Sequence, residues 1–281
     1  MAELTTAMIT DLRARTNAGM MDCKKALQEA NGDMDAAIKL LRERGQAIQV
    51  KRAAKEANQG LICAAVSADG QVMALAETNC ETDFVAKTDG FKKFAARVAD
   101  KVLAGDENVA ETMKDDLVGI VAATGENVKI RRVARYVLAG AGRLESYIHM
   151  GGKVGVLVEV ACGKMQTAAS PAFAELIHDL ALQVAAAAPR WLDGASVPAD
   201  VIAGEKDIYR TQVTGKPANI IEKILDGKIK KFFGEACLVD QVFVKDESKS
   251  KTIAQLVAET GKQVGDTLIV RRFVRYQLGA A

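Results

Sequence analysis

The sequence lacks the short motifs that identify common enzyme classes. It contains no C-x-x-C, H-E-x-x-H or G-x-S-x-G segment and no G-x-x-x-x-G-K-[ST] phosphate loop. Only two histidines are present, His149 and His178, and they lie far apart in the chain. Because no nucleophile, base and orienting group can be assembled from known motifs, we expect a protein that is not an enzyme, with no catalytic residues, no metal and no cofactor.

Paired cysteines are also lacking. The five cysteines, Cys23, Cys63, Cys80, Cys162 and Cys237, are odd in number and widely scattered. This pattern argues against a disulfide framework or a zinc site, and we expect reduced thiols that are buried or half-buried.

Long apolar runs and an excess of one charge are missing as well. No stretch approaches 18 apolar residues, and the N-terminus has no basic segment followed by an apolar core. The 38 basic and 36 acidic residues nearly balance. We therefore expect a cytoplasmic protein with no membrane partner and no direct nucleic-acid partner.

Helical periodicity fills the first part of the chain. The segments "TTAMITDLRART", "MMDCKKALQEAN" and "DMDAAIKLLRERG" predict three short helices, the last capped by Asp33 and ending at Gly45. "QVKRAAKEANQG" is polar and basic and predicts a linker that is partly helical. Residues 1–55 are thus predicted to form a small three-helix domain and linker.

The pattern then changes to strands. Two apolar runs flank Asp69-Gly70, a hairpin signal, and "DGFKKFAARVADKVLA" has helical spacing before the strand "NVKIRRVARYVL". This order predicts the α+β class.

An internal repeat organises the rest of the chain. "GQVMALAETNC" resembles "GKVGVLVEVAC" at an offset of 82 residues, and "IRRVARYVL" recurs as "VRRFVRYQL" at an offset of 140. We predict two copies of one α+β unit, at residues 56–140 and 141–281. The second copy carries an insertion that includes a helical hairpin at about 190–235, expected to form a coiled-coil arm or to pack against a second molecule.

Arginines recur in the last strand of each copy. Strand alternation places Arg131 and Arg135 on one face, with Arg271 and Arg275 in the second copy. They could form a phosphate-binding stripe of a ribosome- or RNA-binding module. The favoured interpretation is the solvated face of a half-buried sheet, because acidic residues are interleaved and the pattern occurs in both copies.

The segment "NCETDFVAKTDGF" raises a different question. Asp83 and Phe84 lie on a connection between strand and helix, where the ring either packs locally or meets a partner. At the 82-residue offset stand Met165 and Gln166, so the second copy manages without the pair. The fold therefore does not require it, although partial burial of the ring against Phe91 stays an alternative.

Several of these motifs resemble one family. "LRARTNAGMMDCKKAL", "NCETDFVAKTDGF", "GENVKIRR" and "GKVGVLVEV" are similar to segments of the elongation factor Ts family, the nucleotide-exchange factors of the translational GTPase elongation factor Tu. The resemblance runs along the whole chain. It implies an N-terminal three-helix domain similar to ubiquitin-associated domains, two similar α+β subdomains and a coiled-coil insertion.

The resemblance also implies contacts. The partner would be GDP-bound elongation factor Tu, whose Mg²⁺ site would be disturbed by insertion of Thr82, Asp83, Phe84 and Val85. Loss of GDP would then give the nucleotide-free form. Further contacts are implied for Met20, Met21, Lys24, Gly125 and His149. We expect one of the two methionines to pack inside the three-helix domain, and His149 to be better placed for an interface than a buried His178. A homodimer or a 2:2 complex through the coiled-coil arm is also expected.

One departure concerns the end of the chain. Many members continue past the last strand into another helical module, whereas this sequence ends at "RYQLGAA". The partner contact of that module is expected to be absent or supplied by other residues.

Overall fold

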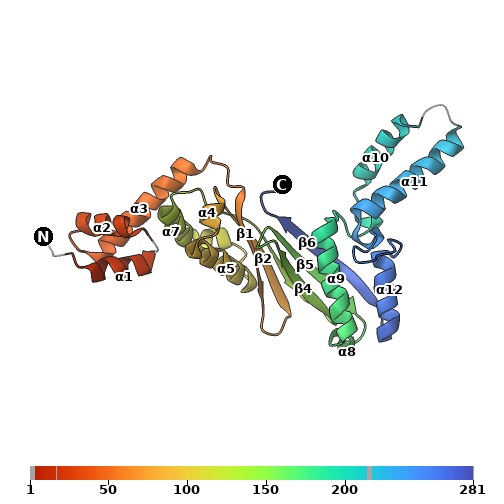
Figure 1. Ribbon diagram of the computed structural model, residues 1–281, viewed down its shortest axis with the longest axis horizontal. Helices are drawn as coiled ribbons and strands as arrows, with labels where there is room; N and C mark the ends of the chain where they lie inside the picture. Colours follow the sequence, from red (N-terminus) through yellow and green to blue (C-terminus); the bar gives the residue numbers. More distant parts are fainter. Residues whose placement is uncertain (1–3, 17, 214–216, 281) are drawn as a thin grey trace. The chain divides into compact units, whose positions relative to one another are not determined.

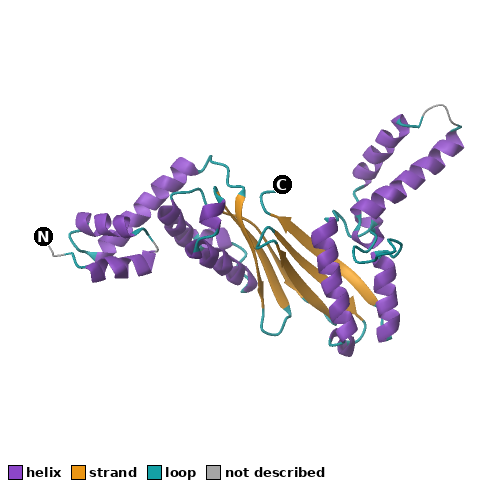
Figure 2. Cartoon of the chain, in the orientation of Figure 1, coloured by secondary structure: helices purple, strands orange, loops and turns teal. Residues whose placement is uncertain are grey.

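The computed structural model describes residues 4–16, 18–213 and 217–280, which contain both helices and sheets (Figures 1 and 2). This mixture agrees with the predicted α+β class. The chain divides into two compact units. Unit 1 comprises Met1–Arg135, Ile148–Gly155 and Tyr276–Ala281, and unit 2 comprises Tyr136–Tyr147 and Val156–Arg275. The domain boundaries given above stay predictions.

Three helices open unit 1: α1 (Thr6–Thr16), α2 (Met20–Glu29) and α3 (Met34–Arg52). They bury a small apolar cluster of Leu12, Ala18, Cys23, Ala26, Leu27, Ala37 and Leu41. Asp33 caps α3 as predicted, because its side chain accepts a hydrogen bond from the backbone N–H of Ala36 at 2.9 Å.

The predicted end of the third helix at Gly45 is wrong, because α3 continues to Arg52. A Cβ atom at Gly45 would lie 2.7 Å from the carbonyl oxygen of Val118 and 3.1 Å from the Cβ of Ala122. This glycine thus allows α3 to pack closely on α7 (Lys114–Thr124), beside which it runs in Figure 1. The segment predicted as a partly helical linker contributes its first residues, 49–52, to this helix, and its last two residues begin β1.

The first α+β unit follows as β1 (Gln59–Val66), β2 (Val72–Cys80), α4 (Asp83–Ala86), α5 (Asp89–Leu103), α6 (Val109–Thr112), α7 and β3 (Lys129–Val137). Strands β1 and β2 pair antiparallel, with Val66 opposite Met73 across the predicted turn. The sheet has the order β1-β2-β3. Helix α5 buries an apolar face that includes Phe91, Phe94 and Val98, and it packs on β1 and β2.

The same order of strands and long helices occurs again as β4 (Gly142–His149), β5 (Val154–Cys162), α8 (Met165–Ala168), α9 (Pro171–Ala187), α12 (Ile253–Val264) and β6 (Leu268–Gln277). These strands form a second sheet with the order β4-β5-β6. Helix α9 buries Phe173, Leu176, Ile177 and Leu180, and it packs against α12.

Two helices are inserted between α9 and α12: α10 (Ala199–Thr211) and α11 (Ala218–Ala236). They contact each other along their lengths and form a hairpin (Figure 1). Among the described residues of α11, the buried apolar ones are Leu225, Ile229, Phe232 and Ala236. Most of the predicted "TGKP" turn lies outside the described residues, and association through the arm stays a prediction.

All five cysteines are free thiols, three of them buried and two half-buried, as predicted. Within the described ranges, no helix has the length and apolar character needed to cross a membrane.

Candidate functional site

The segment from residue 81 to 87, which we call the exposed turn, presents two side chains to solvent. Thr82 caps α4 because its hydroxyl accepts a hydrogen bond from the backbone N–H of Val85 at 3.3 Å. Val85 is half-buried against the core of the first copy. Asp83 and Phe84 point outward, and Phe84 is 78% exposed, so it does not pack locally against Phe91. The turn therefore has two anchoring residues and two presented ones.

A lysine one turn further along pairs with both presented side chains. Lys87 Nζ lies 2.6 Å from the carboxylate of Asp83 and 6.0 Å from the centre of the Phe84 ring. The hydrogen bond from Lys87 lowers the pKa of Asp83, with a smaller contribution from the charge of Lys153. Asp83 is thus a carboxylate at neutral pH, fixed beside an exposed aromatic ring.

A glutamate holds the backbone of the exposed turn. The carboxylate of Glu126 accepts hydrogen bonds from the backbone N–H groups of Glu81 and Thr82, at 3.1 and 3.0 Å, and from the Thr82 hydroxyl at 2.6 Å. In return, the carboxylate of Glu81 accepts one from the N–H of Asn127 at 2.7 Å. These reciprocal bonds join the end of β2 to the start of β3 and make the turn rigid.

The second copy has the same brace. The carboxylate of Asp266 accepts hydrogen bonds from the N–H groups of Gly163 and Lys164, at 3.1 and 2.9 Å, and from the Thr167 hydroxyl at 2.7 Å. Asp266 lies 140 residues after Glu126, which is the offset of the repeat. Neither Glu81 nor Glu126 belongs to the site predicted from the sequence. An acidic residue at the same position of both copies, Glu126 and Asp266, is the signal that could have identified Glu126.

The helix that the second brace supports carries different side chains. Met165 and Gln166 stand in α8 where Asp83 and Phe84 stand in α4, and Met165 is 71% exposed. A short helix thus forms in the same place without an acidic and aromatic pair. This agrees with the inference that the fold does not require Asp83 and Phe84.

The predicted contacts on the first helices lie together on α2. Met20 and Met21 are 52% and 62% exposed, and Lys24 is exposed as well. The expectation that one methionine packs in the three-helix core is wrong, because Cys23, Ala26 and Leu27 fill that side of α2. Lys24 lies one turn after the two adjacent methionines, so the three side chains form one patch on the outer face of the helix.

The remaining predicted contacts, Gly125 and His149, lie at the ends of α7 and β4, and like all the others they belong to unit 1. Gly125 ends α7 in the left-handed conformation with φ of 69°, and Gly265 does the same for α12 with φ of 64°. Gly125 thus has a role in the fold that recurs in both copies. His149 is exposed at the end of β4. The expectation that His178 is buried is wrong. Its side chain is 50% exposed, and its Nδ1 lies 3.2 Å from the carboxylate of Glu145.

Arginines of β3 cover a buried carboxylate. Glu77 is fully buried, and its oxygens lie 3.2 Å from Arg131 Nη1 and 2.6 Å from Arg132 Nε. Burial alone would raise the pKa of Glu77, but hydrogen bonds from the Gly279 N–H, Asn79 and Arg132 outweigh it, and the net pKa is lowered. Arg131 is exposed, as expected for the solvated face of the sheet, and it pairs with this carboxylate as well.

The second copy repeats this arrangement. Glu159 is buried, 3.1 Å from Arg271 Nη1 and 2.7 Å from Arg272 Nε. Arg135 donates to the carbonyl of Leu103 at the end of α5, at 3.0 Å, and Arg275 donates to the carbonyl of Ala185 near the end of α9, at 3.3 Å. Because these guanidinium groups have intramolecular partners, the arginine pattern gives no argument for RNA binding.

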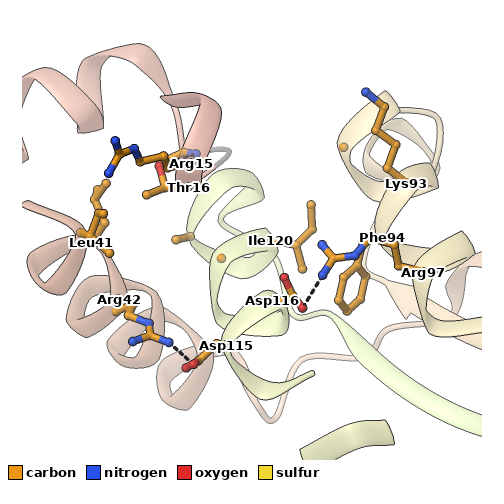
Figure 3. Close-up of a pocket in the computed structure, with 15 residues that line it drawn as sticks. Arg15, Thr16, Leu41, Arg42, Lys93, Phe94, Arg97, Asp115, Asp116 and Ile120 are labelled. Carbon is orange, nitrogen blue, oxygen red and sulfur yellow. Dashed lines mark hydrogen bonds and ion pairs between the residues drawn. The ribbon is translucent and has the colours of Figure 1, made fainter. Parts of the chain in front are cut away.

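A cavity of about 290 Å³ lies elsewhere in unit 1, between the first helices and α5 and α7 (Figure 3). Its charged lining residues include the ion pairs Arg42–Asp115 and Arg97–Asp116, the second at 2.7 Å. None of its described lining residues is a histidine or a cysteine. Among the residues described, no group of three or more His, Cys, Asp or Glu side chains is placed to hold a metal ion. Burial raises the pKa of Cys80, beside the exposed turn, to about 12, so its thiol is protonated at neutral pH.

Comparisons with known proteins agree on one family. A family model described as "Elongation factor TS" matches residues 81–280. Elongation factor Ts of Trichlorobacter lovleyi is 44% identical over 291 residues, which cover 98% of this chain and 93% of the relative. Elongation factor Ts of Nitratidesulfovibrio vulgaris is 43% identical, covering 98% and 96%. Elongation factor Ts of Desulfovibrio desulfuricans is 43% identical over the whole of both chains, at 100% coverage.

Proposed function

Because this chain belongs to the elongation factor Ts family, we propose that it binds elongation factor Tu, disturbs its Mg²⁺ site and promotes release of GDP so that GTP can bind. The family acts in translation elongation by nucleotide exchange and is not a family of enzymes. The protein thus requires no catalytic residue of its own. We further propose that it works in the cytoplasm, where translation takes place.

The single observation that carries the proposal is the exposed turn. An ionised carboxylate and a 78% exposed phenyl ring stand on a capped and braced helix, and the fold builds the same turn elsewhere without them. A ring held in water by a rigid support gains about 1.5–3 kcal/mol when a partner buries it. We propose that Phe84 enters an apolar crevice of the partner and Asp83 contacts polar groups beside it.

The mechanism requires differential binding and no covalent step. A cation is often the largest local charge at a phosphate site, so a contact that displaces Mg²⁺ weakens GDP binding. By linkage, a factor that binds the nucleotide-free partner more tightly than the GDP complex weakens GDP binding by the same ratio. A ten-thousandfold weakening needs about 5.5 kcal/mol of differential contact. Since Asp83 and Phe84 alone do not supply this, other surfaces contribute.

We propose that these other contacts come from Met20, Met21 and Lys24 on α2, from the turn at Gly125 and from His149. All are exposed or on turns of unit 1. Thr82 and Val85 act mainly as the anchors of the exposed turn. The hairpin of α10 and α11 belongs to unit 2 and is proposed as a separate arm, through which a homodimer or a 2:2 complex forms.

Release of fluorescent GDP from elongation factor Tu tests the proposal directly. The wild-type protein should accelerate release strongly at substoichiometric concentration. Asp83→Ala and Phe84→Ala should each reduce that acceleration by at least about tenfold, equivalent to 1.4 kcal/mol. No acceleration by the wild type would contradict exchange itself. Full activity of both variants would contradict only the role of the exposed turn.

A further inference from the structure

Helix α3 is fixed to the first copy along one side, through contacts that we call the α3 seam. At its middle, Gly45 allows the backbone of α3 to approach Val118 and Ala122 of α7, with no room for a side chain. One turn earlier, Arg42 forms an ion pair with Asp115 (Figure 3). The helix is thus held by close packing and by charge.

The seam continues past the end of the helix. Arg52 Nη1 lies 2.8 and 3.1 Å from the two carboxylate oxygens of Glu81. The side-chain amide of Asn127 donates to the carbonyl of Lys55 at 2.7 Å, and Lys129 Nζ donates to the carbonyl of Ala53 at 3.3 Å. The contact that lies nearest to the exposed turn is the one between Arg52 and Glu81. Glu81 directly precedes Thr82, which caps α4.

The second copy identifies the seam as an addition to the fold. Gly163 and Thr267 stand where the first copy has Glu81 and Asn127. The residues at the positions of Val118 and Ala122 are Ala258 and Lys262, which line an open groove in unit 2. The Glu126 brace recurs in the second copy, whereas Glu81 and its partner Arg52 belong to the first copy alone.

We infer that the α3 seam positions the patch of Met20, Met21 and Lys24 relative to Asp83 and Phe84, so that both meet the partner as one preformed docking surface. Glu81 and Arg52 are positioning residues in this surface. The inference rests on the proposed function. Two contact groups on one rigid support bind more tightly than the same groups on a hinge, because less conformational freedom is lost on binding. The seam thus governs affinity for elongation factor Tu more than the maximal exchange rate.

Gly45→Leu tests the inference by forcing α3 away from α7, far from either contact group. We expect the concentration of factor that gives half-maximal GDP release to rise about tenfold, with the maximal rate changed by less than about twofold, because pre-organisation is lost and the contacts are not. Ala47→Leu is the matched control. Ala47 lies on the same helix, two residues after Gly45, but it is exposed to solvent, so both kinetic parameters should stay at the wild-type values.

Arg52→Gln keeps the test decisive if Gly45→Leu unfolds. It should raise the half-maximal concentration about threefold, within the range of one ion pair, while Arg97→Gln, which breaks a different pair in unit 1, should not. In a Met20→Ala, Met21→Ala background the effect of Arg52→Gln should disappear, since a purely structural defect would persist there.

The outcomes separate the two claims. A wild-type protein without exchange activity contradicts the proposed function. An active wild type whose folded Gly45→Leu or Arg52→Gln variant keeps the wild-type half-maximal concentration contradicts the seam and leaves exchange intact. A lower maximal rate at an unchanged half-maximal concentration also contradicts it.

Discussion

Residues 81–87 and residues 163–169 occupy the same place in the two copies, between the second strand and the long helix. Both turns are braced by an acidic residue that follows a left-handed glycine, Glu126 in one and Asp266 in the other. Their surfaces differ, because the exposed turn carries an acidic and aromatic pair and its counterpart carries Met165 and Gln166. The brace therefore belongs to the fold, and the pair is available for a partner.

Exchange of the two surfaces gives the largest expected effect on nucleotide exchange. Asp83→Met together with Phe84→Gln transfers the pair of the second copy to the first. Because both side chains are exposed, we expect the free energy of unfolding to change by less than about 0.5 kcal/mol. The acceleration of GDP release should fall at least about tenfold, or 1.4 kcal/mol in the barrier, measured by stopped-flow fluorescence.

The reverse exchange is its control. Met165→Asp together with Gln166→Phe should give no gain in GDP release, because the second copy lacks the α3 seam beside its turn. A gain in exchange from this variant would show that the pair alone is sufficient.

Substitution of the buried glutamates tests whether the ion pairs of Glu77 and Glu159 stabilise the two copies equally. Glu77→Gln removes the charge that Arg131 and Arg132 neutralise and should destabilise the protein by about 3 kcal/mol, as loss of one partner from a buried ion pair does. Glu159→Gln should have a similar effect in the second copy. Urea unfolding followed by circular dichroism measures both, and a cost in only one copy would mean that the arrangements are not equivalent.

The dependence of stability on acidic pH should report the ionisation of the Glu77 carboxylate. The pKa of Glu77 in the folded protein is lowered from its ordinary value of 4.5. Its stabilising contribution is therefore fully present above about pH 4.5 and is lost as the pH falls through the lowered value. The difference in unfolding free energy between wild type and Glu77→Gln should shrink accordingly. A difference that stays constant from pH 7 to about pH 3 would contradict a lowered pKa.

Substitution of two glycines should have the smallest effects on stability. Gly45 lies in α3, which packs on the first copy, and Gly227 lies in α11, in the arm of the second copy. Gly45→Ala should destabilise the protein by about 1–3 kcal/mol, because the new methyl group collides with α7. Gly227→Ala should stabilise α11 by about 0.5–1 kcal/mol, because it meets no atom and restricts the unfolded chain. Thermal unfolding of both variants distinguishes the two effects, and equal shifts would mean that Gly45 is not at a close contact.

Much of the fold was predictable because its signals are local. The Asp69-Gly70 hairpin, the Asp33 cap and the apolar face of α5 follow from residues near one another in the sequence. The end of α3 was not predictable in this way. A glycine weakens a helix by propensity, but at Gly45 contact with α7 outweighs that preference.

The candidate site likewise contains residues that could be predicted from the sequence and residues that could not. Comparison of the two copies was sufficient to identify Asp83 and Phe84 as dispensable for the fold. The exposure of both Met20 and Met21 depended on which residues of α2 fill the three-helix core, and periodicity did not distinguish these faces. Glu81 gave no signal, because its partner Arg52 lies 29 residues away in the sequence.

The sequence by itself determined the α+β class, the repeated unit and the pair that the second copy lacks, since these depend on local pattern and on comparison within the chain. Only the tertiary structure decided that Glu126 braces the exposed turn, that arginines cover Glu77 and Glu159, and that α3 is seated on α7. Hydrogen bonds, ion pairs and close packing join residues distant in sequence, and their partners become known only when the chain is folded.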